Sequence, residues 1–81
     1  MQYIVNEVHP KDLCAFGEAK VFNTLSDVVR YLQKINEKKR LLMGDWEADS
    51  ALLEEHLKER HATVFVFAES EEDKKWIIAA F

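Results

Sequence analysis

The run from Thr63 to Ala68 constrains the fold most, because every residue in it is apolar or β-branched. A strand with one wet face alternates apolar and polar side chains, so this run is typical of a strand that is covered on both faces. In a chain of 81 residues, such a strand has to lie at the centre of the fold. The sequence therefore predicts a central strand over 63–68. The large aromatic Phe81 further predicts a docked C-terminus.

The length and composition of the chain predict a single domain over residues 1–81. Its hydrophobic content of 48% is ample for one small core. Cys14 is the single cysteine, so neither an internal disulfide nor a thiolate zinc site can form. We find neither a signal peptide nor an apolar run near the ~18 residues that a membrane span needs. These features predict a soluble, cytoplasmic protein.

The first half of the chain predicts a hairpin followed by a helix. Residues 1–8 have the β-branched and aromatic content of a strand, and Pro10 ends it. Residues 14–22 predict a second, weaker strand. Thr24 is a helix N-cap, and apolar residues at helical spacing follow it as far as Ile35.

The second half predicts a second helix, the central strand and a final helix. Residues 41–44 break the first helical pattern, and Asp45 is the expected N-cap of the next helix. Ser70 and Asp73 resemble a capping pair, and Ala79 and Ala80 favour helix, so residues 71–80 predict a helix. A strand over this segment, in a hairpin between Ala68 and Trp76, remains the alternative.

Together these segments predict an α+β fold with a three-stranded sheet. The expected order is strand, strand, helix, helix, strand, helix, with the last element a strand in the alternative. Two helices are expected on one face of the sheet. The first and third strands, 1–8 and 63–68, are expected to be adjacent.

The side chains that carry chemistry form no recognised catalytic or metal-binding pattern. His56 and His61 are five residues apart and point in different directions on a helix, and His9 approaches His61 only if their strands pair. The alternating acids from Asp45 resemble a calcium loop, but His56 stands where the closing glutamate belongs. Cys14 lacks a nearby feature that would activate its thiol. We therefore predict no catalytic residue, no metal and no cofactor, and we do not expect an enzyme.

The leading functional prediction is a non-catalytic protein-binding module with a net charge of −4. Such a module would act as an inhibitor or regulator, of the kind that phages and mobile elements encode, against a protein with a basic surface. Acidic patches steer a protein onto basic surfaces, and aromatic residues supply affinity. Homodimerisation is a further expectation. The predicted contact residues belong to an acidic helix face and an apolar C-terminal element: Asp45, Trp46, Glu47, Asp49, Glu54, Glu55, Trp76 and Phe81.

The alternative is a nucleic-acid-associated regulator that uses a basic cluster within residues 34–40. Its members are Lys34, Lys38, Lys39 and Arg40. Basic residues can contact phosphates, but the cluster lacks the interleaved aromatic residues on which single strands stack. The favourable interaction of positive charge with the end of a helix explains the same cluster without a ligand.

Overall fold

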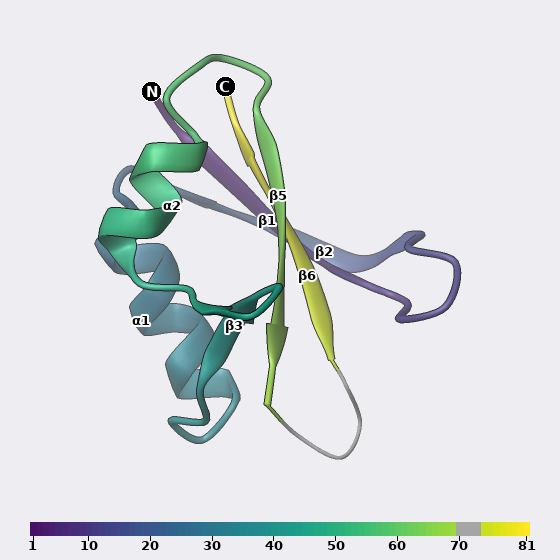
Figure 1. Ribbon diagram of the computed structural model, residues 1–81. Coiled ribbons are helices and arrows are strands. Elements are labelled where there is room, and N and C mark those ends of the chain that lie inside the picture. The colour runs from purple at the N-terminus through teal and green to yellow at the C-terminus, as the bar shows by residue number, and fades with distance from the viewer. Residues whose placement is uncertain (70–73) are drawn as a thin grey trace.

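The computed structural model describes residues 1–69 and 74–81. In this part of the chain six strands form one antiparallel sheet, and two helices lie on one face of it (Figure 1). The strand order is β2-β1-β6-β5-β3-β4. The elements are β1 (Tyr3–Val8), β2 (Ala15–Phe22), α1 (Leu25–Ile35), β3 (Leu41–Met43), β4 (Trp46–Glu47), α2 (Ser50–His56), β5 (Thr63–Ala68) and β6 (Lys75–Ala80).

The predicted three-stranded sheet and its order of elements are wrong. Residues 41–43 of the expected break form β3, and residues 46–47, just after the helix start expected at Asp45, form β4, which pairs with β3. The final helix is also wrong, because residues 75–80 form a strand, as in the alternative. The expected Ser70–Asp73 capping pair lies outside the described residues.

The position of β6 explains why its residues form a strand. Trp76, Ile77 and Ile78 are aromatic or β-branched and suit a pleated surface. β6 pairs along its whole length with β1, and from Lys75 to Ala79 with β5. A helix here would leave both neighbours with an unpaired edge. The predicted contact between the first and third strands is therefore wrong, because β6 lies between them.

The predicted hairpin of the first two strands is confirmed, with an irregularity in its middle. Val5 lies opposite Lys20 and Glu7 lies opposite Phe16, so β2 takes four steps where β1 takes two. Gly17 lies inside this bulge with a φ of 75°, a conformation that glycine adopts at little cost. β2 is an edge strand, and the bulge and its charged residues are features that protect an edge from pairing with other chains.

The predicted first helix is confirmed, including its N-cap. The Thr24 hydroxyl accepts a hydrogen bond from the Asp27 backbone N–H at 3.1 Å. Leu25, Val28 and Leu32 form its buried stripe. At the other end, the buried Asn36 side chain donates to the Leu32 carbonyl at 2.8 Å and satisfies one terminal acceptor.

The second helix begins at Ser50, later than predicted. Gly44 has a φ of 60° and allows the tight turn between β3 and β4, so residues 46–47 pair with β3 instead of starting a helix. Asp49 is the N-cap in place of Asp45, and its carboxylate accepts from the Leu52 N–H at 2.8 Å. α2 buries Leu53, and Leu57 follows at its end.

The core lies between the two helices and one face of the sheet. Along β5 and β6 the burial alternates: Val64, Val66, Ile78 and their neighbours on the helix side are buried, while Phe65 is 43% exposed. The prediction that 63–68 is covered on both faces is therefore wrong. The run is apolar throughout, but only alternate residues enter the core.

The two ends of the described chain are held side by side. Gln2 and Phe81 exchange backbone hydrogen bonds of 2.8 and 2.9 Å, so the predicted docking of the C-terminus is confirmed. Neither described helix has the length and apolar character required to cross a membrane.

Candidate functional site

The face of the sheet away from the helices carries a group of apolar side chains. Cross-strand partners share a face, and the register places Ile4 opposite Val21, Phe65 opposite Ile77, and Phe67 opposite Leu42. No described helix covers this face (Figure 1). We call this surface the open face and define it by six large apolar residues that are not fully buried: Ile4, Val21, Leu42, Phe65, Phe67 and Ile77. The register places Val8 on the same side of the sheet, where it is buried.

Two members of the open face are exposed to solvent. Val21 is 56% exposed and Phe65 is 43% exposed, and the other members are half-buried by their neighbours in the sheet. Charged residues lie at one end, where Lys75 is opposite Phe67 and Glu47 is opposite Leu42. Neither charge forms an ion pair with a described residue. An apolar centre with polar positions at its edge is the usual composition of a protein interface.

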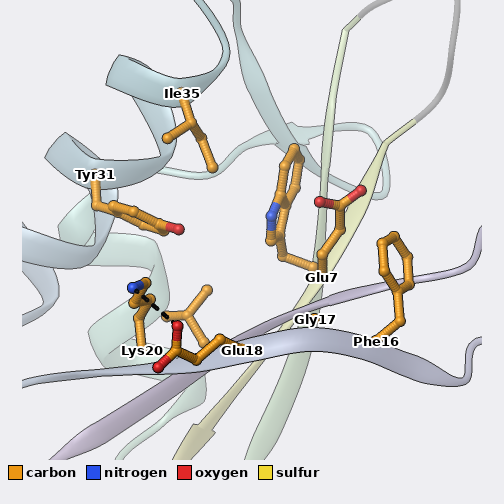
Figure 2. A pocket seen from close by; sticks show the side chains of 9 residues that line it. Glu7, Phe16, Gly17, Glu18, Lys20, Tyr31 and Ile35 are labelled. Atoms are coloured by element: carbon orange, nitrogen blue, oxygen red, sulfur yellow. Dashed lines mark ion pairs between the residues drawn. The ribbon is translucent and has the colours of Figure 1, made fainter.

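A pocket of about 240 Å³ lies on the other side of the sheet, between α1 and the β1–β2 hairpin. Tyr31 and Ile35 project from α1 toward it, and Glu18 and Lys20 project from β2 (Figure 2). We call it the α1 pocket. Its aromatic and charged lining residues are Glu7, Phe16, Glu18, Lys20, Tyr31 and Trp76.

The charges of the α1 pocket are only partly paired. The Lys20 ammonium lies 3.8 Å from the Glu18 carboxylate. Glu7 is half-buried and forms no hydrogen bond or ion pair with any residue that the structure describes. Phe16 is held by a stacked contact with His9, with ring centroids 4.2 Å apart. Tyr31 is held by a tilted contact with Phe22 at 5.2 Å.

The predicted protein-binding residues lie on different elements of the structure. Asp45, Trp46 and Glu47 are exposed at β4 and the turn before it, and Trp46 is 73% exposed. Asp49 caps α2, on which Glu54 and Glu55 are exposed.

The two aromatic residues of the predicted apolar C-terminal element differ in exposure. Trp76 belongs to the core and is 3% exposed, whereas Phe81 is 37% exposed beside Gln2. The apolar C-terminal element therefore does not present both of its aromatic residues to a partner.

The predicted basic cluster lies at and beyond the end of α1. Lys34 is in the last turn, and Lys38, Lys39 and Arg40 follow the helix, with all four exposed. Arg40 pairs with Glu69 at 3.6 Å. Lys34 and Lys38 border a shallow depression together with Arg30 and Glu37, so an acidic side chain shares the same surface.

The histidines and Cys14 are dispersed. His9 follows β1 and His61 precedes β5, at opposite ends of the sheet, so the approach considered for them does not occur. His56 contacts the Leu52 carbonyl through Nδ1 at 3.0 Å, and Cys14 is exposed. Within residues 1–69 and 74–81, no group of three His, Cys, Asp or Glu side chains is placed to hold a metal ion.

Sequence reasoning missed both surfaces for identifiable reasons. Phe16, Glu18 and Lys20 alternate along β2, a pattern that places three unlike side chains on one face of a strand. This alternation can be read from the sequence. The sequence does not show that Glu7 and Trp76 lie beside these residues, because that depends on the pairing of β1 with β6. The open face was hidden because its residues are as apolar as those of the core.

The open face and the α1 pocket lie on opposite sides of the sheet, so a ligand at one does not obstruct the other. Comparison with protein-family models finds no family that matches this chain, and comparisons with curated proteins and with solved structures find no significant match. The geometry of these two surfaces is therefore what bears on function.

Proposed function

We propose that this protein is a non-catalytic protein-binding module whose partner docks on the open face. The observation that carries the proposal is the absence of any described helix over six large apolar side chains on one side of the sheet. Covering apolar surface contributes roughly 25 cal/mol per Å², so a complementary partner would gain affinity from Phe65 and its neighbours. The binding surface that we propose is therefore on the sheet, whereas the sequence predicted the acidic helix face.

The partner that fits this surface is a protein with an apolar patch and basic side chains at its edge. The centre of the open face offers aromatic and aliphatic side chains, and removing their apolar surface from water favours association. Asp45 and Glu47 are exposed at one end of the sheet and offer negative charge there. Charges at the rim of an interface mainly steer the encounter and select the partner.

We place the protein in the cytoplasm as part of this proposal. Cys14 is the single cysteine of the sequence and its side chain is exposed. An unpaired, exposed thiol is compatible with a reducing compartment, where thiols are kept from forming disulfides. A regulator of an intracellular protein would meet its partner in that compartment.

The test compares capture of partners from a cell lysate by two single variants. Phe65→Ser removes an aromatic residue from the open face. Trp46→Ser removes an even more exposed aromatic residue, which pairs with Met43 and lies outside the open face. We expect a partner that is retained by the wild-type and Trp46→Ser proteins and lost with Phe65→Ser. Thermal unfolding checks that both variants are folded.

Two results would count against the proposal. If Phe65→Ser captures the same partner as the wild-type protein, the partner does not bind at the open face. If the wild-type protein captures nothing at low salt, the proposal that it binds a partner is contradicted. Light scattering on the same purified proteins tests whether a second copy of the chain, instead of another protein, covers the open face. A dimer that Phe65→Ser dissociates would show that a second copy covers the open face.

A further inference from the structure

We propose that the α1 pocket binds a small organic ammonium ion that also carries an oxygen acceptor. The site goes beyond the proposed protein-binding function, because it lies on the helix side of the sheet and shares no residue with the open face. Its walls come from α1, β1, β2 and β6, so only the folded chain assembles it. Its volume of about 240 Å³ suits a ligand of a few heavy atoms.

The charge of the pocket favours a cation. Lys20 and Glu18 are 3.8 Å apart and neutralise each other. Glu7 remains without a counter-ion among the described residues, and it is half-buried. A carboxylate that is partly removed from water gains most from a ligand that brings positive charge. The pocket therefore has one uncompensated negative charge.

The walls of the pocket favour an organic cation over a metal ion. Phe16, Tyr31 and Trp76 supply aromatic rings, whose faces attract ammonium groups. The contacts of Phe16 with His9 and of Tyr31 with Phe22 fix two of these rings before a ligand arrives. Aliphatic cover comes from Ile35, which faces the sheet from α1 (Figure 2). Such walls suit the methylated or methylene part of an amine.

The buried indole of Trp76 is an independent observation that points to a ligand with a hydrogen-bond acceptor. Trp76 is 3% exposed and lines the pocket, yet its N–H donates to no residue that the structure describes. A buried indole N–H usually has an acceptor, because leaving it unsatisfied is costly. Trp76 is also the cross-strand partner of Glu7, so donor and carboxylate lie beside each other on one face. A ligand with an ammonium group near a hydroxyl or carbonyl oxygen satisfies both.

Nuclear magnetic resonance of the indole N–H groups tests this assignment directly. The two tryptophans provide the signal and its control, since Trp76 lines the pocket and Trp46 is 73% exposed on β4. The probes are choline, tetramethylammonium and 3,3-dimethylbutan-1-ol, titrated at constant ionic strength. Choline has charge and acceptor, tetramethylammonium has charge alone, and the alcohol is the uncharged analogue of choline.

We expect choline to shift the Trp76 resonance to saturation and to leave the Trp46 resonance in place. The alcohol should bind about tenfold more weakly, because it lacks the attraction to Glu7 and to the rings. Tetramethylammonium should bind more weakly than choline, because it offers no acceptor to the indole. Equal binding of choline and the alcohol, or no response of Trp76 to choline, would overturn the proposal. Equal binding of choline and tetramethylammonium would overturn the role of Trp76.

Two matched variants locate the charge that is recognised. Glu7→Gln should weaken choline binding about tenfold and leave binding of the alcohol unchanged. Glu55→Gln, at an exposed position on α2, should bind choline like the wild-type protein. Choline binding that survives Glu7→Gln would refute the assignment. Phe65→Ser should also bind choline normally, so failure of this site and failure of the open face are separable.

Discussion

Phe65 of β5 lies directly opposite Ile77 of β6 on the open face. The next residue along each strand, Val66 or Ile78, belongs to the core. A single residue step therefore separates a side chain that a partner can reach from one that stabilises the fold. This two-residue alternation makes binding and stability separable by substitution.

Ile77 and Ile78 offer the sharpest test of that separation, because they are neighbours of the same type on one strand. Ile78 is 0% exposed and Ile77 is half-buried on the open face. Ile78→Val should lower the free energy of unfolding by about 1 kcal/mol, because it removes a buried methylene group. Ile77→Val should change it by about 0.5 kcal/mol or less. Urea denaturation measures both, and equal losses would contradict the assignment of faces.

The N-cap of α2 can be located by comparing two aspartates. Asp49→Ala should cost about 1 kcal/mol, because it removes the acceptor for the Leu52 N–H. Asp45→Ala should cost clearly less, because Asp45 lies in the β3–β4 turn, before the helix. Chemical denaturation provides the measurement. A larger loss at Asp45 would instead favour the helix start predicted from sequence.

Gly44 should resist substitution for a reason of backbone conformation alone. A Cβ at this position would meet no atom within 4 Å outside Gly44 and its two chain neighbours, but the φ of 60° is unfavourable for residues with a side chain. Gly44→Ala should therefore lower the free energy of unfolding by about 1 kcal/mol. Gly44→Asn should lose less, because asparagine tolerates this conformation better. An alanine variant as stable as the wild-type protein would argue against this turn geometry.

The two tryptophans should differ in their access to a fluorescence quencher. Trp46 is 73% exposed and Trp76 is 3% exposed. Iodide should quench the emission of Trp76→Phe, in which only Trp46 remains, far more strongly than the emission of Trp46→Phe. The emission of the buried indole should also lie at shorter wavelength. Similar quenching of the two variants would show that Trp76 is not in the core.

The elements set by local signals could be predicted from the sequence. The Thr24 cap and the spacing from Leu25 to Leu32 define α1, and Pro10 ends β1 near its observed boundary. These signals depend on residues a few positions apart. The prediction of hairpin pairing between the first two strands succeeded for the same reason.

The remaining elements depend on contacts between distant residues. Ala79 and Ala80 favour helix while Trp76 to Ile78 favour strand, and only pairing with β1 and β5 decides between them. Residues 41–43 are too short to show a period of two, and they form a strand because Leu41 and Leu42 pair with β5. The α1 pocket could not be predicted for the same reason, since Glu7 meets Trp76 only after β6 has entered the sheet.

The position of β6 has a consequence for how fast the protein folds. In the described sheet, β6 alone joins the β1–β2 hairpin to β5, β3 and β4. Residues paired across β1 and β6, such as Tyr3 and Ala80, are separated by almost the whole chain. Closing so long a loop is entropically costly and slows two-state folding. We expect β5 and β6 to pair early, because few residues separate them along the chain, and the sheet to close late, when β1 pairs with β6.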